Sequence, residues 1–104
     1  MKLNELAADV LAMCRKREWS LHWTARGAYL HLESSELIEA IRGKHGDPLS
    51  EAADVLLVLM SITQNEGIAF TDVVEQARRT VVKLNKAARY KGEEFGTPAA
   101  EATA

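Results

Sequence analysis

Cysteine pairs, long hydrophobic runs and an excess of basic charge are all missing from this chain. Its 104 residues contain one cysteine, Cys14, which cannot form a disulfide within the chain. The longest apolar run, residues 55–60, is far shorter than the roughly 20 residues of a membrane-spanning helix. Thirteen Lys and Arg against 15 Asp and Glu give a formal net charge of −2, so no overall basic field attracts a nucleic-acid backbone. Together with the lack of a signal-peptide pattern at residues 1–10, these absences predict a cytoplasmic protein without a membrane span or a general nucleic-acid partner.

Glycine and proline are also scarce, with six and two residues, and several of them separate segments of helical periodicity. Apolar residues recur every three or four positions in four segments, which predict helices at about 4–18, 26–42, 49–65 and 71–91. No segment has the alternating pattern of a strand. Gly43 and Gly67 follow the second and third segments, and Pro48 suits the first turn of the third. Because the linkers are short, we predict an all-α, up-and-down four-helix bundle in one domain, residues 1–91, and a flexible tail at 92–104.

The third segment is apolar on all sides. Val55 and Val58 lie on one face of the predicted helix, while Leu56 and Leu57 lie on the other. Such a helix must be covered all round, which one four-helix monomer can hardly achieve. We therefore expect homo-oligomerisation, as a homodimer or homotetramer, to complete or extend the bundle, with this helix at or near the interface.

Four carboxylates share the apolar arcs of the second and third segments. Glu33 and Glu36 lie about 60° apart on a helix, and Glu51 and Asp54 repeat the same three-residue step. Carboxylates that point into a core without partners are costly, and the third segment contains no Lys or Arg. Two antiparallel helices can bring both pairs to one point, and an all-oxygen set suits Mg²⁺ or Mn²⁺. We predict a metal site of these four acids, with an inward salt-bridge network to the fourth helix as the alternative.

Other metal and nucleotide motifs are missing. The residues three before His22, His31 and His45 are not acids, so the Glu-x-x-His pairs of di-iron bundles are absent. One cysteine and scattered histidines give no zinc spacing. The sequence has no G-x-x-x-x-G-K-[ST] loop, which excludes a P-loop mechanism.

The two acidic pairs stand in the runs ESSELIEAI, at 33–41, and EAADVLL, at 51–57. These runs resemble the E-x-x-E and E-x-x-D motifs of the MazG-like nucleotide pyrophosphohydrolases, in the all-α NTP pyrophosphatase superfamily, over about residues 29–67. The resemblance implies conversion of a nucleoside triphosphate to the monophosphate and pyrophosphate. It also implies that all four acids hold Mg²⁺, for which Mn²⁺ could substitute. Glu36 or Glu33 would then orient or deprotonate the attacking water.

The flanks of these motifs suggest substrate-binding residues. Trp19, His22 and Trp23 precede the first acidic pair, where relatives similar to dCTP pyrophosphatases carry aromatic and His residues. They would stack on and hydrogen-bond to the base of the substrate. The aromatic residues and the resemblance favour deoxynucleotides, and among these a pyrimidine base. The alternative for the two tryptophans is that they only pack in the bundle.

Basic residues near the end of the fourth segment are candidates for phosphate contacts. The stretch 86–90 is similar to the basic-then-aromatic end of the family's last helix, although Ala87 stands where the family often has Asn. Lys83, Lys86 and Arg89 would balance charge on the pyrophosphate, with a solvated basic face as the alternative.

Two other functions fit the same residues. One is a non-catalytic helical oligomer that binds metal or nucleotide, and product formation separates it from an enzyme. The other is a dUTPase or phosphoribosyl-ATP pyrophosphatase activity on the same scaffold, which a substrate panel separates.

Overall fold

The structure, a computed structural model, describes residues 2–86 and contains four helices in that range. They are α1 Leu3–Lys16, α2 Trp23–Ile41, α3 Pro48–Asn65 and α4 Phe70–Lys86. The described range contains no strand, which confirms the all-α class predicted from the sequence. None of these described helices combines the length and the apolar character needed to cross a membrane. The predicted end of the fourth helix near residue 91 and the predicted tail at 92–104 lie outside the described residues.

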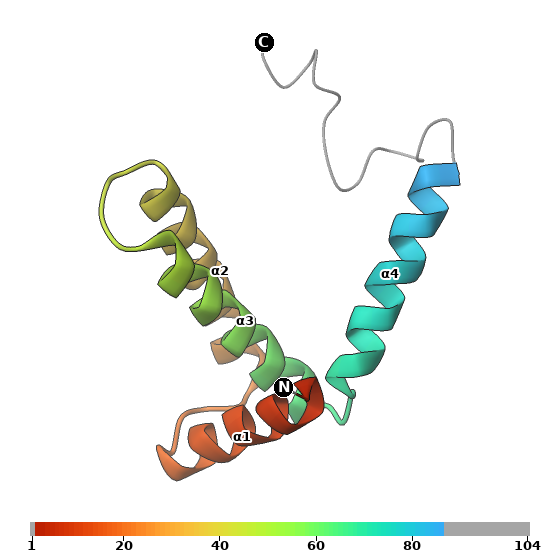
Figure 1. The fold of residues 1–104 in the computed structure, drawn as a ribbon. Coiled ribbons are helices and arrows are strands. Elements are labelled where there is room, and N and C mark those ends of the chain that lie inside the picture. The colour runs from red at the N-terminus through yellow and green to blue at the C-terminus, as the bar shows by residue number, and fades with distance from the viewer. Residues whose placement is uncertain (1, 87–104) are drawn as a thin grey trace. The chain divides into compact units, whose positions relative to one another are not determined.

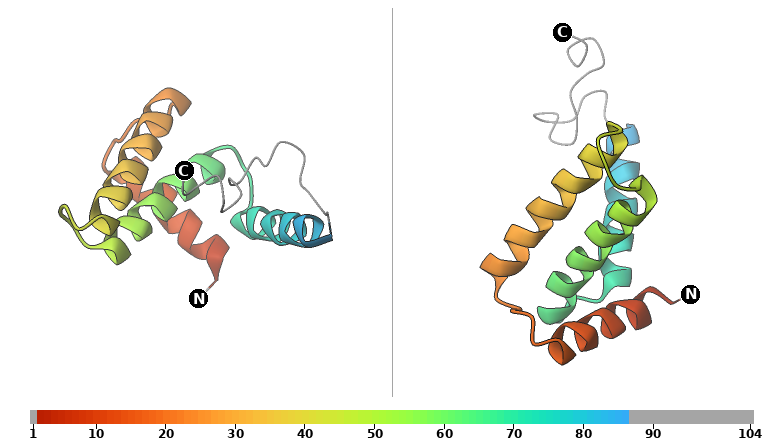
Figure 2. Two further views of the ribbon diagram at one scale, coloured as in Figure 1. Left: turned by 90° about the horizontal axis from the view of Figure 1, so that it is seen from above. Right: turned by 90° about the vertical axis from the view of Figure 1, so that its left-hand side faces the viewer.

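The chain divides into two compact units between Val73 and Val74. In the first unit, α2 and α3 run antiparallel and side by side, as the short linker predicts (Figures 1 and 2). Helix α1 lies across the end of this pair, where α2 begins and α3 ends, and packs on α3. The core of the unit joins α1, α3 and the first residue of α4. Its buried members are Ala7, Val10, Cys14, Met60 and Phe70.

The helix ends in the first unit share one type of turn. Gly43 and Gly67 follow α2 and α3 with φ of 75° and 74°, the left-handed conformation that ends many helices. At the end of α1, Glu18 takes this conformation with φ of 57°, and the Trp19 N–H donates to the Cys14 carbonyl over 3.0 Å. A left-handed residue with a Cβ costs about 1–2 kcal/mol, so glycine is the usual signal for this turn. The sequence gives no such signal for the end of α1, and the turn starts the loop that lets α1 cross the α2–α3 pair.

The helix starts are fixed by side-chain caps. The Nδ1 atom of His22 accepts a hydrogen bond from the Thr24 N–H over 3.2 Å, so α2 begins at Trp23, three residues before the predicted start. Asp47 caps α3 by accepting from the Ser50 N–H over 3.2 Å, and Pro48 is the first helical residue, as predicted.

The first turn of α4 is held to α1 by two hydrogen bonds. The Thr71 N–H donates to Asn4 Oδ1, and Asn4 Nδ2 donates to Thr71 Oγ1, each over 3.0 Å. Both residues belong to the first unit. These bonds fix where α4 begins, at Phe70, one residue before the start that the sequence predicts.

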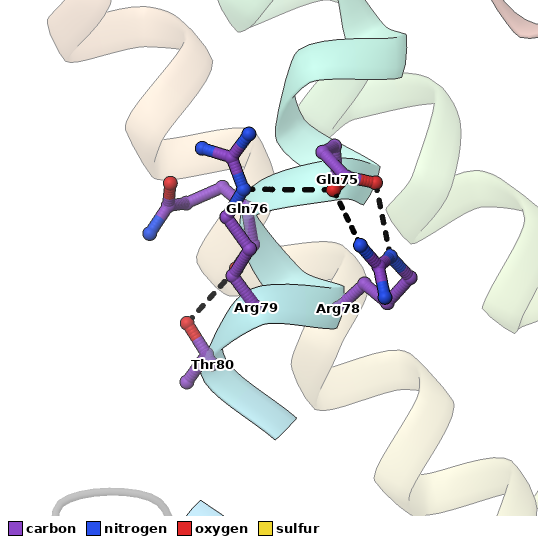
Figure 3. Close-up of polar contacts among 5 residues, drawn as sticks. All are labelled: Glu75, Gln76, Arg78, Arg79 and Thr80. Atoms are coloured by element: carbon purple, nitrogen blue, oxygen red, sulfur yellow. Dashed lines mark hydrogen bonds and ion pairs between the residues drawn. The ribbon is translucent and has the colours of Figure 1, made fainter. Parts of the chain in front are cut away.

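The part of α4 in the second unit is stabilised by local polar contacts (Figure 3). Arg78 pairs with Glu75 over 2.7 Å and Arg79 pairs with the same carboxylate over 3.5 Å. The Thr80 hydroxyl donates to the Gln76 carbonyl over 3.0 Å. The valines at 74, 81 and 82 are exposed.

Candidate metal centre

Three of the four predicted acids converge where α2 and α3 lie side by side. Glu33, Glu36 and Glu51 each offer one carboxylate oxygen within 4.8 Å of the other two, and all three residues are half-buried. The antiparallel pairing explains this geometry, since the Glu33–Glu36 step on α2 faces the start of α3. Three negative charges at this separation repel one another unless a proton or a cation lies between them.

Two carboxylate oxygens in this cluster are sealed from water and have no hydrogen-bond partner. They are Oε2 of Glu33 and Oε2 of Glu51. No Lys or Arg within residues 2–73 forms an ion pair with any acid of the cluster. An unpaired buried carboxylate is costly, and metal ligation would satisfy both oxygens. The donor set is entirely carboxylate oxygen, which fits a hard divalent cation such as Mg²⁺.

The pKa values of two acids record the same crowding. Burial raises the pKa of Glu33 above its ordinary value of 4.5, and a hydrogen bond and the charge of Glu36 raise it further. Burial likewise raises the pKa of Glu51, followed by the charges of Glu36 and Asp54, while His45 opposes this shift. The folded protein therefore disfavours the charged forms of both groups. A bound cation would reverse this preference, so metal binding should release protons where these acids are still protonated.

Asp54 lies beside the three-acid cluster. It is exposed, it is not one of the three residues within 4.8 Å, and its charge raises the pKa of both Glu33 and Glu51. Asp54 and Glu33 also line one cavity. The structure thus brings together Glu33, Glu36 and Glu51 and places the fourth predicted ligand at their edge.

The loop before α3 approaches the cluster closely at Gly46, a residue that sequence reasoning treated only as part of a linker. Gly46 has φ of 87°, and a Cβ built on it would lie 3.1 Å from Glu51 Oε1. Glycine therefore leaves room for the Glu51 carboxylate at this point. The only available signal was a glycine directly before the Asp-Pro helix start.

A cavity of about 320 Å³ in the first unit opens beside Glu33 and Asp54. Helices α1, α2 and α3 and the loop after α1 all contribute to its wall. The lining residues are Val10, Met13, Cys14, Trp19, Arg26, Glu33, Asp54, Leu57, Val58 and Ser61.

Arg26 is the residue of this cavity that sequence reasoning missed. Arg26 is 5% exposed and lines the same cavity as Glu33. Its Nε donates to the Ser20 carbonyl over 2.9 Å, and its guanidinium carbon lies 4.9 Å from the centre of the Tyr29 ring. The seven-residue step to Glu33 was the available signal, because it puts both residues on one helix face.

The predicted substrate-binding aromatic residues occupy different places. Trp19 lines the cavity and has Arg17 over its ring at 5.7 Å. His22 caps α2 and stacks on Trp23, with ring centres 5.3 Å apart. Trp23 is 71% exposed, and neither His22 nor Trp23 lines the cavity.

The predicted phosphate-binding residues lie on α4 or beyond the described range. Lys83 and Lys86 line a surface hollow of the second unit together with Arg78, Arg79 and Val82. Arg89 lies outside the described residues. The structure therefore does not test the phosphate contacts proposed for these three basic residues.

The fold and the cluster define the class of the protein as an all-α domain with three acidic residues that could hold a metal ion. The model of the MazG nucleotide pyrophosphohydrolase domain matches residues 23–87, and the chain belongs to this family. The match includes all four predicted metal-binding acids. Searches of curated proteins and of solved structures gave no match.

Proposed function

We propose that the protein is a Mg²⁺-dependent nucleoside triphosphate pyrophosphohydrolase that converts a (d)NTP to the (d)NMP and pyrophosphate and favours deoxynucleotides. The observation that carries this proposal is the three-acid cluster with its two orphaned buried oxygens in a chain of the MazG family. Family membership supports the reaction class, and the cluster supports the metal requirement.

In this proposal Glu33, Glu36, Glu51 and Asp54 hold Mg²⁺, and Mn²⁺ can substitute. When bound, the ion offsets the repulsion between acids and phosphates and polarises the phosphorus that is attacked. Glu36 orients the attacking water and accepts its proton, with Glu33 as the other candidate for this role. The contact of Glu36 with both other acids supports its central place, because its charge raises the pKa of Glu33 and of Glu51.

The base and the phosphates are assigned to residues on either side of the acids. Trp19 stacks on the base, supported by its position in the cavity wall, and His22 and Trp23 are the other residues assigned to base contacts. Lys83, Lys86 and Arg89 balance the charge of the leaving pyrophosphate.

A homodimer or homotetramer, acting in the cytoplasm, is part of the same proposal. Ile41 and Leu49, at the two sides of the loop between α2 and α3, are 62% and 79% exposed, and Ile38 and Leu56 are exposed as well. A second copy would cover these side chains. The family match spans both units, which supports one functional domain over residues 1–91. Sedimentation should find an oligomer at micromolar concentration, and a folded monomer there would contradict this part.

Product analysis tests the activity. The protein is incubated with each common dNTP and NTP, with Mg²⁺ or with EDTA, and nucleotide products and pyrophosphate are measured separately. Monophosphate and pyrophosphate in equal amounts, formed only with metal, are expected. A diphosphate and inorganic phosphate would contradict the reaction, and metal-dependent nucleotide binding without turnover would favour the non-catalytic alternative.

A further inference from the structure

Arg26 is a buried cation in the wall of the cavity beside the acids. It is 5% exposed and lines the cavity with Glu33 and Asp54, yet within residues 2–73 it forms no ion pair with a carboxylate. Burial is costly for an arginine without a charged partner, because the guanidinium loses much of its hydration. Such a residue calls for an explanation beyond packing.

Existing contacts hold the Arg26 side chain in place but use only part of its donors. The Nε atom donates to the Ser20 carbonyl, and the Tyr29 ring lies under the guanidinium. In the described part of the chain, the terminal nitrogens have no hydrogen-bond partner. They are not sealed from water either, because the sealed and unpartnered side-chain atoms of this region are carboxylate oxygens of Glu33 and Glu51. Arg26 therefore keeps its two terminal nitrogens available to a ligand.

The rest of the cavity suits a flat ring rather than a phosphate. Val10, Met13, Leu57 and Val58 make its wall largely apolar, and Trp19 offers an aromatic face. Arg26 and Glu33 are seven residues apart on one face of α2, which is about 10.5 Å along the helix. If the phosphates of a nucleotide lie near the acids, at the Glu33 end of the cavity, the base of the same nucleotide would lie toward the Arg26 end.

We infer that Arg26 selects the base of the nucleotide by donating two parallel hydrogen bonds to a base with two adjacent acceptors. This inference rests on the proposed function. Cytosine presents O2 and N3 side by side, and guanine presents O6 and N7. Adenine places its amino donor beside N1 and N7, and uracil and thymine place an N–H between their carbonyls. A guanidinium has donors only, so its fork matches the first two bases and meets a donor on the other three.

The test measures binding apart from turnover. The α,β-imido analogues of dCTP, dGTP, dATP and dTTP are titrated by calorimetry with Mg²⁺ into the wild type, Arg26→Lys, Arg26→Met and Arg42→Met. Arg26→Lys keeps the charge and loses the fork, so it serves if Arg26→Met fails to fold. Arg42→Met is the matched control, because Arg42 is an exposed arginine at the other end of α2 that pairs with Glu39.

The wild type should bind the cytosine or the guanine analogue at least about tenfold more tightly than the adenine and thymine analogues. The two favoured analogues are compared directly, which shows whether the cavity takes one ring or two. Arg26→Lys should reduce the preference to about twofold or less, and Arg42→Met should keep it. A wild type that does not prefer cytosine or guanine, or a preference that survives in Arg26→Lys, would overturn the inference.

The product assay separates this result from the fate of the proposed function. Hydrolysis by the wild type with an unchanged base order in Arg26→Lys would overturn the role of Arg26 and leave the activity standing. Loss of the base order in Arg26→Lys, in a protein that hydrolyses no triphosphate, would support the role of Arg26 and contradict the activity. If the wild type neither bound the analogues nor hydrolysed any triphosphate, both the role of Arg26 and the proposed activity would be overturned.

Discussion

Two clusters of charged residues in this molecule use the same helical spacing with opposite results. On α4, Glu75 lies three and four residues before Arg78 and Arg79, the pairs are exposed, and the hydrogen bond with Arg78 holds the pKa of Glu75 below its usual value. On α2 and α3, acids meet acids, two oxygens are buried without partners, and the pKa values of Glu33 and Glu51 are raised. In the α4 cluster the Glu75 carboxylate is paired with two arginines, whereas within residues 2–73 no Lys or Arg pairs with the acids of the α2–α3 cluster. Charge composition and burial, not spacing, separate a surface ion pair from a candidate metal site.

The largest expected effect comes from removing one charge of the three-acid cluster. Glu36→Gln keeps the shape of the side chain and should lower turnover at least about 100-fold, because the metal loses a ligand at the centre of the site. In EDTA the same change should raise the midpoint of thermal unfolding, since it removes like-charge repulsion. Glu39→Gln, one turn away and paired with Arg42, is the matched control and should retain activity. Equal activity in Glu36→Gln and the wild type would refute the assigned site.

Gly46→Ala should have the next largest effect, a weaker binding of Mg²⁺, because the new Cβ would lie 3.1 Å from Glu51 Oε1 and displace this carboxylate. The positive φ adds a cost of about 1–2 kcal/mol to folding. Gly43→Ala separates the two causes, since Gly43 has a similar φ of 75° and no atom within 4 Å of its Cβ position. Denaturant unfolding should show similar losses of stability for both variants, and Mg²⁺ titration should show weaker binding only for Gly46→Ala. If both variants bound Mg²⁺ more weakly, the cause would be the strained backbone of the loop and not the contact with Glu51.

A smaller effect is expected from pH in the absence of metal. Because the folded pKa values of Glu33 and Glu51 lie above 4.5, the stability these groups contribute is full below that pH and is lost as pH rises through the folded values. In EDTA, the Glu33→Gln/Glu51→Gln double variant should therefore gain stability over the wild type as pH rises, measured by urea unfolding from pH 4.5 to 7.5. Saturating Mg²⁺ should stabilise only the wild type and remove this gain. If the difference in stability between the double variant and the wild type in EDTA did not change with pH, the pKa values of Glu33 and Glu51 would not be raised by burial and by the neighbouring acids.

The smallest effect should follow from breaking the α4 cluster. Glu75→Gln removes exposed ion pairs, which contribute little and are screened by salt. Metal binding and the midpoint of thermal unfolding should stay close to those of the wild type. A large loss of metal affinity in Glu75→Gln would erase the distinction between the two clusters.

Much of the fold and the acidic site followed from local sequence signals. Gly43, Gly67 and Pro48 mark boundaries of α2 and α3 as predicted, because left-handed glycine and first-turn proline are local effects. The meeting of Glu33, Glu36 and Glu51 followed from their three-residue steps on antiparallel helices.

The features that escaped prediction depend on contacts between distant residues or on unusual local choices. Glu18 ends α1 in a conformation that glycine normally takes, and His22 caps α2 in place of the usual Ser, Thr, Asp or Asn. Gly46 matters because Glu51 lies against it, and Arg26 is buried because the cavity and Tyr29 surround it. The periodicity of apolar residues predicts helix faces, but it does not predict such contacts between one element and another.

The account depends most directly on a cation held by the three-acid cluster. The decisive measurement is the titration of Mn²⁺ into metal-free wild type, Glu36→Gln and Glu39→Gln, followed by the loss of the free Mn²⁺ electron paramagnetic resonance signal. The account predicts saturable binding in the wild type and Glu39→Gln and at least about tenfold weaker binding in Glu36→Gln. Equal affinity in all three proteins, each shown to be folded, would contradict it.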